Sequence, residues 1–226
     1  MMFRNRVDAG RRLAAALAGY KGEDVVVLAL PRGGVPVAAE IATALDAPLD
    51  LVLVRKIGTP GQPELAMGAV ADGEVPLVVR IPQIIRAAGV DEATFKRVLT
   101  AELAEITRRR DLYLGDRPRA RIAGRVAIVV DDGLATGATA KAALRAVRQQ
   151  DPGRLILAVP VGAADTLADF AEEADAVLCL EPQQGLGSIG HYYDDFAQTS
   201  DEAVQAILAR CLAERDRESR STGARG

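Results

Sequence analysis

The residues best suited to chemistry lie in one short stretch, residues 126–139. Five apolar residues (126–130) are followed there by Asp131 and Asp132, and then by a turn of small residues with two threonines. A helical pattern follows, so main-chain N–H groups of the turn would lie at a helix N-terminus, where an anion is favoured. Small side chains let a phosphate approach the backbone, and threonine hydroxyls can add hydrogen bonds. The residues expected to enclose a phosphate are Ala135, Thr136, Gly137, Ala138 and Thr139.

The two acids need a partner other than the phosphate, because adjacent carboxylates would repel it. They suit the vicinal hydroxyls of a sugar, or Mg²⁺ held directly or through water by Asp131 and Asp132. The alternative is a plain helix cap and turn, since Asp, Thr and Gly are ordinary capping residues. The succession of strand, acid pair, turn and helix is more specific than a cap and favours a functional site.

The apolar runs predict the sheet that positions this stretch. Runs at residues 25–30, 126–130 and 155–159 each precede a turn and a helical pattern, and two more runs lie at 49–54 and 176–180. Continuous apolar runs are typical of strands buried on both faces of a parallel sheet. Strand–helix–strand repetition predicts an α/β fold, doubly wound, with a mainly parallel central sheet flanked by helices.

The pattern changes between residues 58 and 112. Residues 58–63 contain two glycines and two prolines and are expected to form a loop. Residues 68–71 and 77–79 predict a β-hairpin, and a long helix is expected from about 91 to 112. That helix ends in Arg108, Arg109 and Arg110, which we interpret as a solvated face.

Ligands of open α/β sheets bind outside the carboxyl ends of the strands. The ends of the first two predicted strands should therefore lie beside the acid pair. The first end carries Arg32, Gly33 and Gly34, and the second carries Arg55 and Lys56. Cations and glycine N–H groups facing two acids would suit a magnesium pyrophosphate, although solvated loop ends would have the same composition.

Residues 126–139 resemble the phosphoribosyl pyrophosphate (PRPP) signature of type I phosphoribosyltransferases, in which apolar residues, two acids and a spacer precede Thr-Gly-x-Thr. The resemblance extends over residues 24–196. It implies that Asp131 and Asp132 hold the ribose 2′- and 3′-hydroxyls and that residues 135–139 enclose the 5′-phosphate. It also implies that the loop with Arg32 binds pyrophosphate and that Arg55 and Lys56 meet this leaving group.

The resemblance further implies a mobile loop and a hood over the acceptor base. The loop would include residues 58–64, with Glu64 either contacting the ligand or remaining a surface carboxylate. The hood would come from residues 1–20 and 183–213 around a core at 22–182. Ile189, Tyr192 and Tyr193 are its candidate base contacts, and the tyrosines could equally anchor the loop to the core.

The predicted function is transfer of a phosphoribosyl group from PRPP to a nitrogenous base, with Mg²⁺ as cofactor and pyrophosphate as the second product. Such an enzyme is a pentosyltransferase. Two alternatives remain open: a regulator that senses nucleotides or PRPP without catalysis, and a PRPP hydrolase with water as acceptor. The sequence contains no acceptor-specific motif.

Composition limits the remaining possibilities. The chain has 226 residues and a net charge of −3, which disfavours a mainly electrostatic nucleic-acid partner. With a single histidine, the sequence gives little support for a Ser-His-Asp catalytic triad. The two cysteines are far apart and do not have the spacing of metal ligands. No apolar run has the length of a membrane span, so we expect a cytoplasmic protein without a membrane partner. We expect one domain at residues 1–214, a flexible tail at 215–226, and a homodimer as a possible assembly.

Overall fold

The computed structural model describes residues 2–73 and 75–223. Its centre is a five-stranded sheet in the order β2-β1-β6-β7-β8, and every neighbouring pair of strands is parallel. The α/β fold expected from the apolar runs is therefore confirmed. The strands are β1 (Val25–Ala29), β2 (Leu49–Leu51), β6 (Val126–Val130), β7 (Arg154–Ala163) and β8 (Ala176–Gln183).

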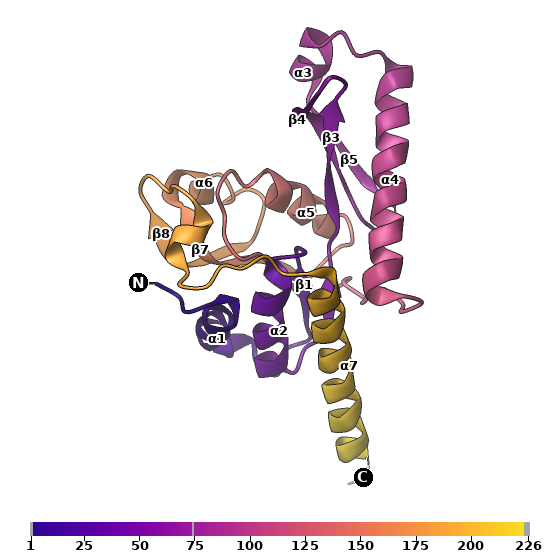
Figure 1. The fold of residues 1–226 in the computed structure, drawn as a ribbon. Helices are drawn as coiled ribbons and strands as arrows, with labels where there is room; N and C mark the ends of the chain where they lie inside the picture. Colours follow the sequence, from indigo (N-terminus) through magenta and orange to yellow (C-terminus); the bar gives the residue numbers. More distant parts are fainter. Residues whose placement is uncertain (1, 74, 224–226) are drawn as a thin grey trace.

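Helices cover both faces of this sheet, as Figure 1 shows. Alternate residues of β1 point to opposite faces, so Val25 and Val27 join one buried cluster while Val26 and Leu28 join another. The first cluster includes residues of α1 (Arg6–Ala16), α2 (Gly34–Leu45) and α7 (Asp201–Gly223), and the second those of α5 (Ala138–Arg148). The short helix α6 (Ala164–Ala168) follows β7. Burial on both faces explains why the strands read as unbroken apolar runs.

A second, antiparallel sheet stands apart from the first, with α4 alongside it (Figure 1). It contains β3 (Val54–Thr59), β4 (Gln62–Ala71) and β5 (Leu77–Arg80). Helices α3 (Pro82–Ala87) and α4 (Glu92–Leu114) follow it. The hairpin expected at residues 68–79 is confirmed, with Ala71 opposite Leu77. The long helix is confirmed too, and Asp91 caps it by accepting the N–H of Thr94 at 2.7 Å.

Two predictions about residues 49–63 were wrong. The apolar run at 49–54 is divided between two sheets: Val52 still donates its N–H to Ala29 O in the parallel sheet, whereas Leu53 O accepts the N–H of Asp72 beside β4. Arg55 and Lys56 therefore lie within β3 rather than after a strand of the central sheet. The expected loop at 58–63 is a tight hairpin between β3 and β4, and Gly61 turns the chain with a left-handed φ of 79°.

The C-terminal helix continues to Gly223, so the segment expected as a flexible tail from residue 215 is helical up to that residue; residues 224–226 lie outside the described part of the chain. Ser200 caps this helix, because its Oγ accepts the N–H of Ala203 at 3.2 Å. In the part of the chain that the structure describes, every helix is too short or too polar to cross a membrane.

Buried charges join the two sheets, because Arg110 lies 3.9 Å from Asp50 of β2 and also contacts Asp72 after β4. Arg110 of α4 donates to Asp72 at 3.0 Å, and Arg119 donates to the other oxygen of the same carboxylate. Asp72 is only 5% exposed. The interpretation of Arg108, Arg109 and Arg110 as a solvated face was therefore wrong for Arg110, because β4 ends directly against that side of the helix. Arg108 and Arg109 pair instead with Glu105 of their own helix.

Candidate functional site

The candidate site lies where the strand order of the central sheet reverses. From β1 the chain continues to β2 on one side, while β6, β7 and β8 follow on the other. Leu30 N–H donates to Val130 O at 2.9 Å, so the loops after β1 and β6 begin side by side. A Cβ atom on Gly34 would lie 2.6 Å from Val130 O, so glycine is required for this approach. This is the point at which open α/β sheets bind ligands.

The loop that follows the acid pair, residues 133–137, is firmly held at its base and exposed at its tip. Leu134 exchanges backbone hydrogen bonds with the end of β7, donating to Val161 O at 2.8 Å and accepting from Ala163 N at 3.0 Å. Thr166 Oγ1 donates to Ala135 O at 2.8 Å. The tip residues Ala135 and Thr136 are exposed. The backbone of the loop is thus fixed by hydrogen bonds, while its tip is accessible to a ligand.

Gly137 is the residue on which the turn into α5 depends. It adopts a left-handed φ of 70°, and a Cβ atom there would lie 2.7 Å from the ring of buried Phe170. Directly afterwards α5 begins at Ala138, and the first N–H groups of a helix have no partner within it. Ala138 and Thr139 are exposed at this helix start. Residues 135–139 therefore include an exposed helix start, an arrangement that favours an anion.

Asp131 and Asp132 follow β6 and occupy the middle of the site. Asp131 Oδ1 accepts the N–H of Asp132 at 2.9 Å, which orients the first carboxylate toward the second residue. The pKa of Asp131 is raised above its ordinary value, first by desolvation and second by the negative charge of Asp132. Both acids therefore lie between strand β6 and residues 135–139, the proposed phosphate loop.

Asp132 is held from the side of the N-terminal helix. Arg6 Nε donates to Asp132 Oδ2 at 2.8 Å, and the two side chains are only 11% and 16% exposed. The hydroxyl of Tyr193 donates to Asp132 O at 2.6 Å. Sequence reasoning missed Arg6, because a lone arginine on an amphipathic helix has no distinguishing spacing.

The cations expected around a pyrophosphate have different surroundings. Arg32 lies at 3.5 Å from Asp201 of α7, whose same oxygen accepts the hydroxyl of Tyr113 at 2.6 Å. That hydroxyl is the main cause of the lowered pKa of Asp201. Burial first, and then Asp201, raise the pKa of Tyr113 to about 12. Arg32 therefore lies at the site, paired with a carboxylate of the protein.

Arg55 and Lys56 point to opposite faces of β3, as successive strand residues do. Arg55 donates to Glu102 of α4 at 2.7 Å, so its side chain packs toward the helix. Lys56 is exposed and borders a hollow of about 210 Å³ that Ala138 and Thr139 also line. Lys56 is thus brought to the phosphate loop and Arg55 is not. Glu64 is an exposed residue of β4, near the hairpin turn.

An open cavity of about 630 Å³ lies beside the acid pair. Its walls come from the loop after β1, the loop after β6, helix α1 and the segment before α7. Only Arg32, Gly33, Asp132, Ala135 and Ile189 were among the predicted site residues. The cavity is lined by Arg6, Arg32, Gly33, Asp132, Ala135, Gly187, Ser188, Ile189, Phe196, Gln198 and Thr199.

The aromatic residues after the short helix η2 (Ile189–Tyr192) form part of the cover over this cavity. Tyr193 is 4% exposed and packs between Phe3 and Phe196, with ring centroids 5.4 and 4.9 Å away. It is therefore an anchor, and the alternative that it stacks on a base was wrong. Tyr192 accepts the N–H of Phe3 through its carbonyl oxygen at 2.8 Å. Phe196 and Ile189 reach the cavity instead.

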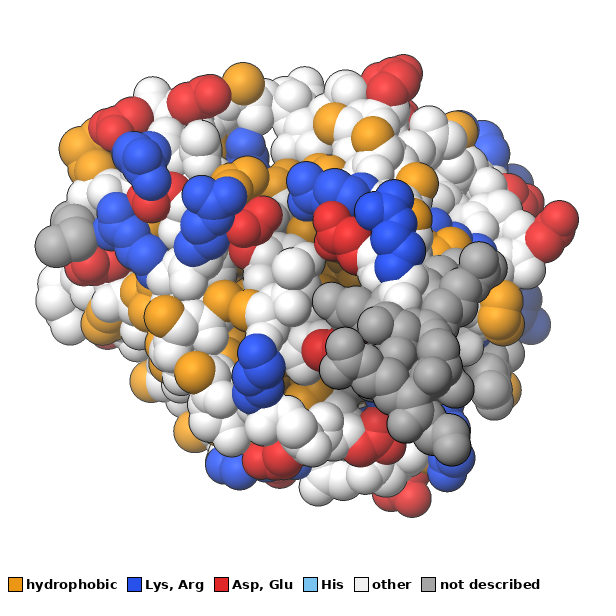
Figure 2. All heavy atoms as spheres, turned by 90° about the horizontal axis from the view of Figure 1, so that it is seen from below, with side chains coloured by type: hydrophobic (Ala, Val, Ile, Leu, Met, Phe, Trp, Pro, Cys, Tyr) orange, Lys and Arg blue, Asp and Glu red, His pale blue; other side chains and the backbone are white. Residues whose placement is uncertain are grey.

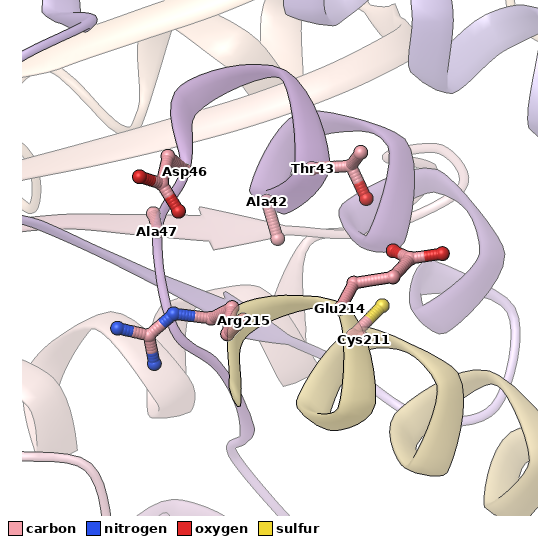
Figure 3. Close-up of a pocket in the computed structure, with 7 residues that line it drawn as sticks. All are labelled: Ala42, Thr43, Asp46, Ala47, Cys211, Glu214 and Arg215. Carbon is pink, nitrogen blue, oxygen red and sulfur yellow. The ribbon is translucent and has the colours of Figure 1, made fainter. Parts of the chain in front are cut away.

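A different pocket lies far from the acid pair and does not belong to the site. Figure 3 shows its lining, which joins the end of α2 (Ala42, Thr43, Asp46, Ala47) to α7 (Cys211, Glu214, Arg215). The site adjoins the beginning of α2, so this pocket lies at the opposite edge of the sheet. Its volume of about 90 Å³ is too small for a nucleotide-sized ligand.

The donors present would fit Mg²⁺. The acid pair supplies hard carboxylate oxygens, which this ion prefers, and Arg6 occupies only one oxygen of Asp132. Within residues 2–73 and 75–223 no group of three or more His, Cys, Asp or Glu side chains could enclose an ion. An ion here would complete its shell with water and ligand oxygens, as Mg²⁺ commonly does.

Comparison with known proteins agrees with this geometry. The family model "Phosphoribosyl transferase domain" matches residues 3–187. Two Mycobacterium tuberculosis proteins, from strains CDC 1551 and H37Rv and each named "Putative phosphoribosyl transferase", are 47% identical over 209 residues. The match covers 92% of this chain and 47% of theirs, so the chain spans about half the length of these relatives.

A solved structure shares both sequence and fold. The crystal structure of TT1426 from Thermus thermophilus has a TM-score of 0.78 and 43% sequence identity, and the match covers 92% of this chain and 98% of that one. The family match extends over most of the chain and includes both the acid pair and the phosphate loop. The chain therefore belongs to the phosphoribosyl transferase domain family.

Proposed function

We propose that this protein transfers a 5-phosphoribosyl group from PRPP to a nitrogenous base and releases pyrophosphate. One observation carries the proposal: an exposed helix N-terminus, an acid pair and a glycine loop meet at one edge of the sheet. Each of these parts matches one portion of PRPP. The family membership supports the same reaction class.

The 5′-phosphate would bind at residues 135–139. The left-handed turn at Gly137 and the first turn of α5 offer main-chain N–H groups, and Thr136 and Thr139 add hydroxyls. Because Leu134 is fixed to the end of β7, the loop would not need to reorganise around the phosphate. The ribose would then extend toward the acid pair, where Asp131 and Asp132 would accept hydrogen bonds from its 2′- and 3′-hydroxyls.

The chemistry needs no protein nucleophile. The bond between ribose C1 and the pyrophosphate oxygen breaks, both electrons leave with pyrophosphate, and a nitrogen lone pair of the base forms the new bond while that nitrogen loses its proton to solvent or to pyrophosphate. The centre resembles an oxocarbenium ion in between, so nearby carboxylates stabilise it. Arg32 would offset the charge of the leaving group from the open cavity, and Lys56 would do so from the hollow that Ala138 and Thr139 also line.

Mg²⁺ is proposed as the cofactor. Asp131 and Asp132 would hold it directly or through water, together with oxygens of the ligand. Bound there, the ion would neutralise negative charge on the pyrophosphate. The acceptor would lie in the open cavity under the hood predicted at residues 1–20 and 183–213, where Ile189 and Phe196 offer apolar surface.

The decisive experiment is a pyrophosphate-release assay with PRPP and Mg²⁺ over a panel of purines, pyrimidines and small aromatic bases. Release that depends on one base, with formation of the matching nucleotide, is the expected result. Release without any base would indicate hydrolysis by water. No release with any acceptor, together with tight binding of PRPP, would contradict the transferase proposal.

A binding role without transfer is the second candidate, and one observation favours it. Three charges expected to serve the ligand are already paired within the protein: Asp132 with Arg6, Arg32 with Asp201, and Arg55 with Glu102. Regulation through nucleic acid is a narrower form of this binding role, and it would need a basic surface on the protein. On the face seen from below in Figure 2, basic and acidic side chains are interspersed. Calorimetry with PRPP beside the release assay separates the two candidates.

A further inference from the structure

Arg6 contacts three different parts of the candidate site at once. Its Nε donates to Asp132 Oδ2 at 2.8 Å, and its Nη1 donates to Ala197 O at 2.7 Å. Its guanidinium lies 3.9 Å from the ring centroid of Phe196. The planar guanidinium can serve all three because its donors diverge in a fixed fork. Arg6 therefore has a single well-defined position, between the acid pair and the hood.

The backbone around Arg6 is fixed as well. Phe3 N–H donates to Tyr192 O and Phe3 O accepts from Asp194 N, both at 2.8 Å. Helix α1 then begins at Arg6, capped by Asn5, whose side chain accepts the N–H of Asp8 at 3.0 Å. The start of the chain and residues 192–197 thus form one unit, and Arg6 connects that unit to Asp132.

The carboxylate that Arg6 contacts lies at the proposed pyrophosphate loop. A Cβ atom on Gly33 would overlap Asp132 Oδ2, so this oxygen lies against the loop backbone. An unpaired negative charge in that position would repel the phosphates of PRPP. A cation that contacts the same oxygen removes this repulsion, and it also leaves Oδ1 of Asp132 available to a ribose hydroxyl.

From these contacts we infer that Arg6 is a positioning residue for PRPP: it orients Asp132 and offsets its charge so that one carboxylate can serve the ribose next to an anionic leaving group. The inference rests on the proposed function, because it assumes that PRPP occupies this site. It adds a residue from the N-terminal helix to a ligand site otherwise built from the loops after β1 and β6.

The test is calorimetric titration of PRPP with Mg²⁺ into the full chain and its variants. Arg6→Gln is expected to weaken PRPP binding by roughly 10-fold or more, as for coupled neighbouring residues. Arg6→Lys should lose less affinity than Arg6→Gln, because it keeps the positive charge although it lacks the fork of guanidinium donors. The matched control is Arg11→Gln on the same helix, where the side chain is 66% exposed and pairs with Glu40. It should bind as the wild type does.

A double-mutant cycle separates positioning from a merely structural role. If Arg6 acts through Asp132, then Arg6→Gln in an Asp132→Asn background should change the affinity by less than about 2-fold. An Arg6→Gln variant that is folded by circular dichroism and binds PRPP as tightly as the wild type overturns the inference. An equal loss of PRPP affinity on Arg6→Gln in the wild-type and Asp132→Asn proteins also overturns the inference. Wild-type binding without pyrophosphate release would refute transfer alone, and wild-type protein that binds no PRPP overturns both.

Discussion

Gly33 lies so close to the carboxylate of Asp132 that a methyl group on its Cα would overlap Oδ2. The loop after β1 therefore packs directly against the Asp132 side chain after β6, although Gly33 and Asp132 are 99 positions apart in the sequence.

We predict that Gly33→Ala weakens PRPP binding by about 10-fold or more, because an added Cβ must displace either the loop or the Asp132 carboxylate. Calorimetry with PRPP and Mg²⁺ measures the effect. Gly19→Ala is the control, since a Cβ at Gly19 would meet no atom of the described residues within 4 Å. Equal affinity of the two variants would show that the loop does not contact the ligand.

Replacing the acid pair should abolish turnover while leaving the fold intact. Asp131→Asn with Asp132→Asn is expected to lower turnover by about 10²-fold or more, the size of a lost electrostatic contact to a transition state. The amides keep the shape of both side chains, and circular dichroism verifies the fold. Unchanged pyrophosphate release with the best acceptor would refute the assignment of these residues.

Asp201 should compete with the ligand for Arg32. The pair is partly exposed, with a separation of 3.5 Å, so its contribution is on the order of 1 kcal/mol or less. Asp201→Asn removes the competing charge, so we expect the KM for PRPP to fall by up to about 5-fold with kcat little changed. Glu172→Gln, at an exposed carboxylate outside α7, is the control. A higher KM in Asp201→Asn would mean that Asp201 holds Arg32 in its working position.

The contact between the two sheets, formed by the buried ion pairs of Asp72, should contribute to the stability of the protein. Its buried carboxylate pairs with Arg110 and Arg119, and Arg110 Nη2 has no hydrogen-bond partner among the described residues. Asp72→Ala would leave the buried guanidinium of Arg110 without its main partner, which we expect to lower the free energy of unfolding by about 3–5 kcal/mol. Urea denaturation measures this, and Glu64→Ala, at an exposed carboxylate, should have little effect. Similar free energies of unfolding for the two variants would contradict a stabilising role of the Asp72 ion pairs.

Glu105 should titrate far below an ordinary glutamate. Hydrogen bonds from Arg108, and then from Arg109, lower its pKa to about 2. A carboxyl whose pKa is lower in the folded state stabilises the fold above its unfolded pKa, near 4.5, and this contribution is lost as the pH falls toward 2. Carboxyl NMR should follow the titration directly. Glu105→Gln should destabilise the protein at pH 7 but barely at pH 2; an equal difference at both would contradict the ion pairs.

The order of apolar runs was enough to predict the parallel sheet, and the small residues before a helix were enough to predict where an anion could bind. Both depend on local chemistry: strands buried on both faces must be apolar throughout, and a helix N-terminus after small residues forms an anion site wherever it occurs. The acid pair could be located in the same way, because strand, acids and turn are adjacent in the sequence.

The environment of those residues depended on contacts that no local pattern encodes. The run at 49–54 looks like one strand, but its second half pairs with β4 because Leu53 meets Asp72 across the turn of the chain. Because the chain changes from pairing with β1 to pairing with β4, the side chain of Arg55 contacts Glu102 and Lys56 lies near the proposed phosphate loop. Arg6 reaches Asp132 across 126 residues of sequence. Local spacing predicts periodic elements, whereas the pairing of distant charges requires the folded chain, because only packing brings them within hydrogen-bond distance.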